Sequence, residues 1–320
     1  MSAIVCFGVH ILDTIAAPID EVPKLQNSVR VERILHAVGG TAAGVAMDLV
    51  HLGSSAATIG VVGDDPTGQF LLGLMRAKGV DVDAVRTLTG AQSSSSVLLI
   101  DSLGNRPALH VRGVHEVAEW DDLDLAPLAN ADFVHVGGLD ALSALGRTEV
   151  VTMLRTLRAR GTFVSLDFQS SAQHLTPELL ELVGEVDAFL PNDEQAAGLT
   201  GLTAIDEIAH ALLLTGVRQV IITCGAEGIY FADRSQTFKV DAFPATVRDT
   251  TGCGDSVVAA YLSALSRGYS LRDALTLASA AGAAVASGIG SLGELPSWDG
   301  LCLQAGVLTN TASDRTEGVK

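Results

Sequence analysis

The chain has few cysteines, and they lie far apart. Among its 320 residues only four are cysteine, namely Cys6, Cys224, Cys253 and Cys302. This spacing contains no CxxC pair and no Cys/His pattern that would hold zinc, so it excludes a disulfide framework and a zinc site. Reduced thiols are typical of a cytoplasmic protein, and we predict that compartment. The first apolar run also lacks the preceding basic stretch of a signal peptide.

Basic and aromatic residues are scarce as well. Lys and Arg number 20 against 37 Asp and Glu, which gives a formal net charge of -17. Nucleic-acid-binding proteins normally carry a basic face, so we expect no nucleic-acid partner. One apolar run, at 274–290, is long enough to suggest a membrane span. Because Ala, Gly and Ser dominate it, we predict a buried helix there and no membrane partner.

Short apolar runs alternate with helical patterns along most of the chain. Such alternation is typical of α/β proteins, in which helices cover both faces of a parallel sheet. We predict strands at 3–7, 57–62, 133–136, 163–167, 188–191, 219–223 and 229–232. We predict helices at 40–52, 67–78, 146–160, 177–183, 193–199, 204–214, 256–266 and 270–287.

Two segments interrupt this alternation. Residues 13–35 and 93–112 contain β-rich stretches, which we predict to form a small separate sheet. Ligands of parallel sheets bind at the carboxyl ends of the strands, and a lid there would exclude water from a reaction. We therefore predict one domain over 1–308 with both lid segments inserted, followed by a disordered polar tail at 309–320.

The most informative stretch runs from Asp249 to Val258 and reads DTTGCGDSVV. Its glycines precede a predicted helix, so backbone N–H groups without helical partners would point outward, backed by the positive end of the helix dipole. This arrangement binds anions such as phosphate. Phosphate would repel Asp255 unless that residue has a chemical role, such as taking a proton from an attacking hydroxyl. A helix N-cap is the structural alternative for Asp255, and the two roles can coexist.

A second motif lies about 200 residues earlier. It reads GGTAAGVA at 39–46, and IGVVGDDPTG follows at 59–68. Together with DTTGCGD at 249–255, it makes the chain similar to the ribokinase-like (PfkB) carbohydrate kinases over about residues 3–300. The resemblance implies a three-layer α/β/α sandwich with a mostly parallel central sheet and a small β-sheet lid. It also implies a carbohydrate kinase that uses ATP and Mg²⁺ and, in some members, a monovalent cation such as K⁺.

The resemblance assigns the catalytic residues to the 249–258 stretch. Asp255 matches the family's general base, which deprotonates the acceptor hydroxyl. The backbone N–H groups of Gly252, Cys253 and Gly254 would hold the phosphoryl oxygens as charge develops on them. The family usually has alanine where Cys253 stands, so we interpret Cys253 as a small filler. The alternative is an oxidisable thiol whose pKa is lowered by the helix N-terminus.

The acceptor side is assigned to the N-terminal part of the chain. Asp13 follows the first predicted strand, and the matching family aspartate binds sugar hydroxyls. Gly39 and Gly40 would let the backbone approach the sugar. His10 is a further candidate for a sugar contact, with a packed histidine as the equal alternative. Gly44 stands in the same site where sugar-binding members often have asparagine, so one sugar contact would be missing there.

The nucleotide side is assigned to the C-terminal half. The stretch TCGAEG at 223–228 follows an apolar strand and resembles the family's nucleotide loop, although a hairpin turn would use the same glycines. The residues that the resemblance assigns to ATP are Asn192, Thr223, Gly225, Gly228 and Gly254.

The family's metal pattern is only partly present. It consists of Asn, two residues and Glu, whereas here Asn192 is followed by Gln195 at the last position, with Glu194 one residue earlier. Glu194 would then serve the water shell of Mg²⁺. Asp249 and Thr251 match positions that bind a monovalent cation in some members.

The sequence leaves the acceptor open between a sugar, a nucleoside and a sugar phosphate. The lid segments contain no aromatic residue that would stack on a base, which favours a sugar. Their arginines could hold a second phosphate or lie on the surface; these are Arg30, Arg33, Arg106 and Arg112. A non-catalytic sugar sensor that kept the fold is the alternative of another class. Exposed lid strands also suggest a homodimer through the lid.

Overall fold

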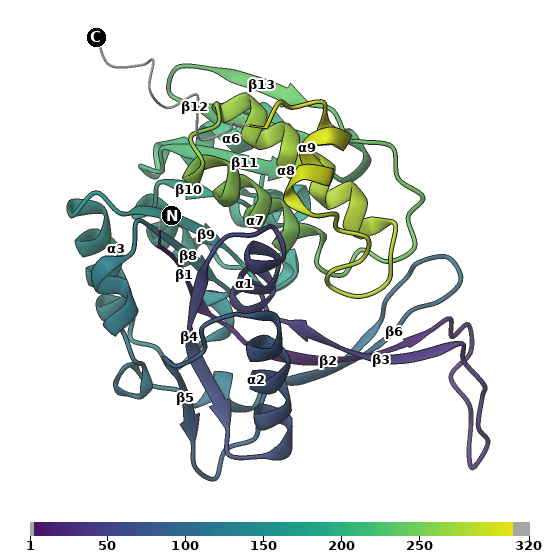
Figure 1. Cartoon of the computed structure of the whole chain (residues 1–320). Helices are drawn as coiled ribbons and strands as arrows, with labels where there is room; N and C mark the ends of the chain where they lie inside the picture. The colour runs from purple at the N-terminus through teal and green to yellow at the C-terminus, as the bar shows by residue number, and fades with distance from the viewer. Residues whose placement is uncertain (1–2, 310–320) are drawn as a thin grey trace.

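A nine-stranded sheet forms the centre of the protein, and the computed structural model describes residues 3–309 (Figure 1). Its strands are β1 (Ile4–Gly8), β4 (Ala56–Gly63), β5 (Val85–Leu88), β8 (Phe133–Gly137), β9 (Phe163–Asp167), β10 (Ala188–Phe189), β11 (Gln219–Thr223), β12 (Ile229–Asp233) and β13 (Thr237–Val240). They lie in the spatial order β13-β12-β11-β10-β9-β8-β1-β4-β5. Neighbours from β11 to β5 are parallel, whereas β12 is antiparallel to β11 and β13. The parallel strands therefore end along one common edge.

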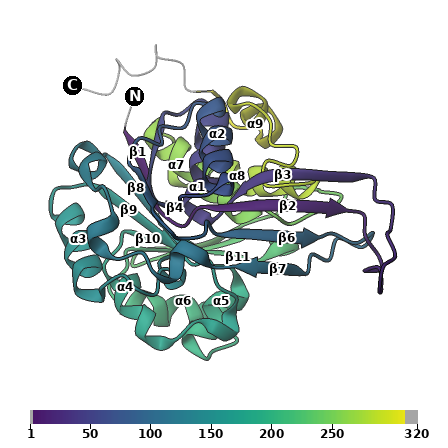
Figure 2. The ribbon, with the colours of Figure 1, turned by 90° about the horizontal axis from the view of Figure 1, so that it is seen from below.

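Helices cover both faces of this sheet (Figure 2). One layer consists of α1 (Thr41–His51), α2 (Pro66–Lys78), α7 (Cys253–Ser266), α8 (Leu271–Ala286) and α9 (Trp298–Ala305). The other consists of α3 (Arg147–Ala159), α4 (Leu180–Gly184), α5 (Asp193–Thr200) and α6 (Ile205–Leu214). Each layer shares a hydrophobic cluster with its face of the sheet, around Tyr261 on one side and Phe189 on the other. The predicted α/β/α sandwich is confirmed.

Local sequence explains why these elements form where they do. Every residue of β1 is buried, as is typical of a parallel strand between two helical layers. The first turn of α2 contains Pro66 and is capped by the Asp65 side chain, which accepts a hydrogen bond from Gly68 N. The same helix ends at Gly79, which adopts the left-handed conformation that favours glycine.

A second sheet, which we call the lid, extends away from the main body (Figures 1 and 2). Its strands are β2 (Ile11–Ala17), β3 (Arg33–Gly39), β6 (Ser95–Leu99) and β7 (Ala108–Val111), in the spatial order β3-β2-β6-β7. Ile15 and Leu98 pack with Ile289 in a small cluster, whereas Ile34 and Leu109 are exposed. The predicted separate sheet is confirmed, and its first hairpin extends beyond the predicted segment 13–35.

The sequence pattern missed some elements and misplaced others. The short strands β5 and β13 and the helix α9 were not predicted. Helix α7 begins three residues earlier than predicted, because Gly254 is helical despite the low helix propensity of glycine. The predicted helix at 177–183 is a 3-10 turn, Pro177–Leu179, followed by α4. The remaining 3-10 turns are η1 (Gly113–Glu116), η2 (Trp120–Asp122), η3 (Ala126–Asn130), η4 (Leu139–Ala141), η5 (Ala172–His174) and η7 (Gly225–Glu227).

Two predictions concern the C-terminal part. The apolar run at 274–290 contributes most of α8, which is largely buried in the hydrophobic core, as predicted. Within residues 3–309 no single helix is long and apolar enough to cross a membrane, although the bent pair of α5 and α6 passes by length and composition. The predicted tail at 309–320 lies, apart from its first residue, outside the described residues.

Candidate active site

The predicted site residues gather where the parallel strands end. Gly8 and Gly137 pair at the ends of β1 and β8. The start of α1 approaches this point closely, because a side-chain Cβ added to Gly137 would lie only 2.6 Å from Ala42 N. Helix α7 begins beside α1, since a Cβ on Gly44 would lie 2.4 Å from Asp255 Oδ2. The N-termini of two helices thus meet at the carboxyl edge of the sheet, where α/β proteins bind ligands.

The turn that opens α7 has the geometry of an anion site. Gly252 is left-handed, with φ of 79°, and its Cβ would lie 2.2 Å from Ser291 O, so only glycine fits. A Cβ on Gly254 would meet no atom within 4 Å, so open space lies in front of the first helical turn. The N–H groups of that turn have no helical acceptor. One predicted donor is partly engaged, because Cys253 N–H donates to Thr250 O at 3.3 Å.

Asp255 lies in this first turn and is half-buried against α1. Burial raises the pKa of its carboxyl well above the ordinary 3.8, and the charges of Asp167 and Asp13 raise it further. The charge of Arg106 lowers it. A carboxyl with a raised pKa accepts a hydroxyl proton more readily than a solvated one. Gly44 has no side chain and so leaves room for the Asp255 carboxyl. This space is what Gly44 contributes to the site in the structure.

The acceptor residues predicted from the lid also come together. Asp13 is 7% exposed on β2, opposite Ala37 of β3. A Cβ on Gly39 would lie 2.2 Å from Asp13 Oδ2, so the glycine makes room for the carboxyl. Gly40 caps α1 with φ of 86°. Burial raises the pKa of Asp13 to about 6.

His10, in contrast, does not face a sugar site. It is 1% exposed, its Nδ1 lies 2.9 Å from Gly8 O, and its Nε2 lies 2.9 Å from Thr58 Oγ1. Burial lowers its pKa to about 4. Because protein atoms engage both ring nitrogens, the predicted sugar contact of His10 is corrected to the packed-histidine alternative.

The predicted ATP residues lie at the ends of β10 and β11. Asn192 and Thr223 form a parallel bridge, so the structure brings them side by side. Gly225 is exposed in the turn between β11 and β12. Gly228 has φ of 86°, and its Cβ would lie 2.1 Å from Val240 O. The hairpin interpretation of this loop is therefore confirmed, and its role in ATP binding stays a prediction.

The residues near Asn192 explain the departure from the family's metal pattern. Gln195 is buried, and its Nε2 donates to Phe168 O at 2.9 Å and to Ser170 O at 3.0 Å. Its Oε1 accepts from Asn192 N at 3.0 Å. A glutamate could not donate these bonds, so the amide has a structural role. Glu194 is exposed beside it, as is Asp193, and the role of Glu194 in the water shell of Mg²⁺ stays a prediction.

The described residues contain no group of three or more His, Cys, Asp or Glu that could hold a metal ion. Mg²⁺ in kinase sites is bound by substrate phosphates and waters with one or two carboxylates. The donors present therefore fit a Mg²⁺ that the ATP phosphates carry, and they do not form a metal site of their own.

Asp249 is fully buried and anchors the loop before α7. Its Oδ1 accepts from Thr251 N at 2.9 Å and from Thr251 Oγ1 at 2.7 Å, and its Oδ2 accepts from Gly290 N at 2.8 Å. Protein donors thus engage both carboxylate oxygens. This geometry fits a loop anchor, and a monovalent cation at Asp249 and Thr251 stays a prediction.

The thiol of Cys253 does not have the lowered pKa that a helix N-terminus can produce. Burial and the charge of Asp249 raise the pKa of Cys253 to about 12. A raised pKa disfavours the thiolate on which oxidation depends, so it supports the small-filler interpretation of Cys253.

One of the four lid arginines reaches the site. Arg106 lies between β6 and β7, and its Nε donates to Thr250 Oγ1 at 3.1 Å. Arg112 instead donates to Ala141 O at 2.8 Å. The two arginines of the segment 13–35 are exposed. The lid therefore delivers one positive charge to the turn that opens α7.

Sequence reasoning assigned no role to two buried acids near Asp255. Asp48 is 1% exposed on α1, and its Oδ2 has no hydrogen-bond partner among the described residues. Burial and Asp255 raise the pKa of Asp48 well above 3.8. Asp167 ends β9 and is the largest charge effect on Asp255. The sequence does contain a signal for Asp48, because it is the one charged residue in the apolar stretch 42–49.

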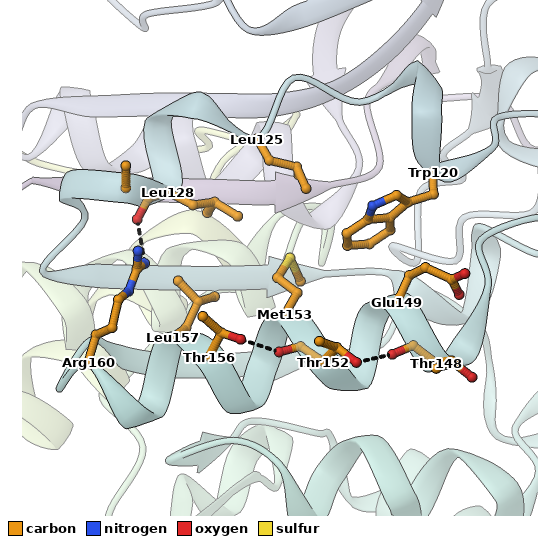
Figure 3. A pocket seen from close by; sticks show the side chains of 11 residues that line it. Trp120, Leu125, Leu128, Thr148, Glu149, Thr152, Met153, Thr156, Leu157 and Arg160 are labelled. Atoms are coloured by element: carbon orange, nitrogen blue, oxygen red, sulfur yellow. Dashed lines mark hydrogen bonds between the residues drawn. The ribbon is translucent and has the colours of Figure 1, made fainter.

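An apolar cavity of about 440 Å³ lies elsewhere, between η2, η3 and α3 (Figure 3). The side chains of Trp120, Leu125 and Met153 line it. No residue predicted for catalysis, acceptor or nucleotide binding lines this cavity. It is therefore separate from the candidate active site.

Comparisons with known proteins agree with this geometry. The family described as "pfkB family carbohydrate kinase" matches residues 1–298. A probable fructokinase-4 of Arabidopsis thaliana is 27% identical over 82% of this chain and 85% of its own length. An aminoimidazole riboside kinase of Salmonella typhimurium is 28% identical over 88% of this chain and 90% of its own length. A ribokinase of Arabidopsis thaliana, solved with ribose and ATP, has the same fold with a TM-score of 0.80 at 22% identity, over 95% of this chain and 98% of the other.

Proposed function

Because the chain belongs to the pfkB family of carbohydrate kinases, we propose that it transfers the γ-phosphoryl group of ATP to a hydroxyl of a sugar or sugar-like acceptor. One observation carries this proposal. The carboxyl of Asp255 lies in the first turn of α7, beside N–H groups without helical acceptors, and its electrostatic environment includes the carboxyl of Asp13 on the lid. This neighbourhood supports a site in which Asp255 would act as base, the turn would hold phosphate and Asp13 would bind a polyol.

In the proposed reaction the acceptor oxygen attacks the γ-phosphorus while Asp255 takes the hydroxyl proton. A new P–O bond forms, and the bond to the leaving ADP breaks. The free N–H groups at the start of α7 hydrogen-bond to the phosphoryl oxygens as charge develops on them. The open space at Gly254 leaves room for that group. Arg106 adds a positive charge from the lid, which links closure of the lid to stabilisation of this charge.

The ATP side is proposed to lie at the ends of β10 and β11. Asn192 and Gly225 are exposed there, and Asn192 lies beside Thr223 through the bridge that joins the two strand ends. Mg²⁺, when bound to the ATP phosphates, would shield their negative charge and hold them for in-line transfer. Glu194 is the exposed carboxylate that would hold waters of that ion.

On the acceptor side, the lid geometry supports a sugar. Side chains alternate along a strand, so Thr14 and Asp13 point to opposite faces of β2. Thr14 pairs with His36, which packs edge-on against Phe70. This aromatic contact therefore lies on the face of the lid away from Asp13. A nucleoside base next to Asp13 would not find Phe70 to stack on.

A sugar phosphate is the second candidate acceptor, and Arg106 is the observation that favours it. Its guanidinium lowers the pKa values of both Asp13 and Asp255, so its charge acts on the acceptor site. An acceptor with its own phosphate would gain an ion pair there.

The experiment that tests the proposal is a turnover panel with purified full-length chain, ATP and Mg²⁺. The acceptors are fructose, ribose, fructose 6-phosphate, ribose 5-phosphate and adenosine, and phosphorus NMR identifies the product. We expect a phosphomonoester and an equal amount of ADP with at least one sugar or sugar phosphate. Sugar binding by calorimetry without turnover on a broad panel would instead indicate a non-catalytic sensor.

A further inference from the structure

A row of polar side chains crosses the lid beside Asp13. In the register of the lid strands, Asp13 on β2 lies opposite Ser96 on β6, and Ser96 lies opposite His110 on β7. The Nδ1 of His110 lies 3.0 Å from Ser96 Oγ, and the Ser96 side chain hydrogen-bonds to the Asp13 carboxyl. Asp13 is therefore the first member of a connected polar row that continues across two further strands.

This row lies on the face of the lid that is turned toward the main body. Side chains two residues apart on a strand point to the same face. Ile15 and Leu98 follow the first two members of the row at this spacing, and both pack with Ile289 of the main body. His110 shares this face through its register, and it is exposed. An acceptor held by Asp13 can therefore reach the His110 ring.

His110 forms the end of the row that is remote from the proposed base. The electrostatic environment of Asp255 includes Asp13, whereas that of His110 includes Arg112 and His115. His110 also lies two strands further across the lid than Asp13. Neighbouring strands are about 4.8 Å apart, so the row is about 10 Å long between these two residues. A row of this length suits an acceptor that has polar groups at both ends.

The His110 ring is suited to a hydroxyl group. Burial and the charge of Arg112 lower its pKa below the ordinary 6.5, so the neutral ring predominates at pH 7 and above. A neutral imidazole has one nitrogen that donates a hydrogen bond and one that accepts. A hydroxyl group can do both, so it can pair with either tautomer of the ring.

We propose that His110 binds a hydroxyl of the acceptor at the end remote from the transferred phosphoryl group, and that Ser96 positions the His110 ring. The acceptor is then held at both ends, by Asp13 near the base and by His110 at the far end. The lid thereby selects an acceptor with a hydroxyl at its far end over one whose far end is apolar. The inference rests on the proposed function, because it assumes that Asp13 contacts the acceptor.

The test compares His110→Leu with a matched variant, His36→Leu. His36 is also exposed on the lid and its Nδ1 lies 3.1 Å from Thr14 Oγ1, but this pair is on the opposite face. The acceptor is the member of the turnover panel with the highest kcat/KM. We expect His110→Leu to raise the KM for this acceptor about three- to tenfold, which corresponds to one neutral hydrogen bond. Its kcat and its KM for ATP should stay unchanged, and His36→Leu should change none of the three constants.

Derivatives of this acceptor that lack one hydroxyl each identify the contact. The wild type should show a raised KM for every derivative whose missing hydroxyl is bound in the site. For one of these derivatives, His110→Leu should raise the KM no further, because both changes remove the same hydrogen bond. His110→Gln keeps a side chain that hydrogen-bonds, so it should raise the KM less than His110→Leu. Ser96→Ala should also raise the KM for the acceptor, because the ring loses the hydroxyl that positions it.

A wild-type KM for the acceptor in His110→Leu would overturn the inference. An equal rise in His36→Leu would also overturn it, as would a further rise in KM with every derivative. If His110→Leu does not fold, His110→Gln and Ser96→Ala decide by the same comparison. If the wild type turns over no acceptor, the proposed function fails, and acceptor binding measured by calorimetry takes the place of KM. The failure of the proposed function and the failure of this inference are thus distinguishable.

Discussion

Replacing Asp13 by asparagine should stabilise the protein without ligands while it abolishes acceptor binding. The carboxyl is 7% exposed, and burial raises its pKa to about 6 from the ordinary 3.8. The Asp13 carboxyl therefore binds its proton more tightly in the folded state than in the unfolded state. This difference contributes fully to the free energy of unfolding below about pH 3.8, and the contribution is lost as the pH rises through about 6. Above that window the folded chain carries a buried charge that the variant does not have.

The size of the effect follows from the difference between the two pKa values. A difference of about two pH units corresponds to about 3 kcal/mol at 1.36 kcal/mol per unit. Asp13→Asn should therefore raise the free energy of unfolding by up to about 3 kcal/mol near pH 8, and by little near pH 4. Urea denaturation of both proteins across this range, without ATP or acceptor, measures the difference. A difference that does not change with pH, or a variant that is less stable near pH 8, would refute the reasoning.

The remaining predictions concern two glycines and one buried amide. Gly252→Ala should lower the free energy of unfolding by about 1–3 kcal/mol or more, since the left-handed backbone and the contact with Ser291 O both oppose a side chain. Gly254→Ala, whose Cβ meets no protein atom, should unfold at an equal or slightly higher denaturant concentration. Its turnover should fall, because the methyl group takes the space of the phosphoryl group; unchanged kcat/KM would contradict this. Gln195→Glu should cost about 1–3 kcal/mol in urea denaturation, because two backbone carbonyls lose their donor, and wild-type stability would exclude this structural role.

The sequence was sufficient to predict the architecture and the glycine-rich turn before α7. Alternating apolar and helical runs predicted the layers, and two glycine-rich motifs far apart in the chain meet at the carboxyl edge of the sheet. Contacts between side chains that are distant in the sequence were harder to predict. The predicted start of α7 is three residues late because glycine has a low helix propensity, and Gly254 nevertheless lies in the first turn of the helix.

The roles of individual polar residues depended on partners that are distant in sequence. The sequence makes His10 a candidate for a sugar contact, but its ring contacts Gly8 O and the hydroxyl of Thr58, which is 48 residues away. Gln195 departs from a metal-binding pattern, but its donors serve carbonyls 25 and 27 residues earlier. Burial and the neighbouring Asp249 raise the pKa of Cys253, although this residue begins a helix. Burial and long-range contacts of this kind cannot be read from a local motif.

The central claim is that Asp255 takes the proton of the acceptor hydroxyl. It is tested most directly by Asp255→Asn, with the acceptor that the turnover panel identifies. Asparagine keeps the size of the side chain but cannot accept the proton, so kcat should fall by about a factor of 10² or more. ATP affinity, measured by calorimetry, should remain close to that of the wild type. Turnover near the wild-type rate in Asp255→Asn would contradict the account.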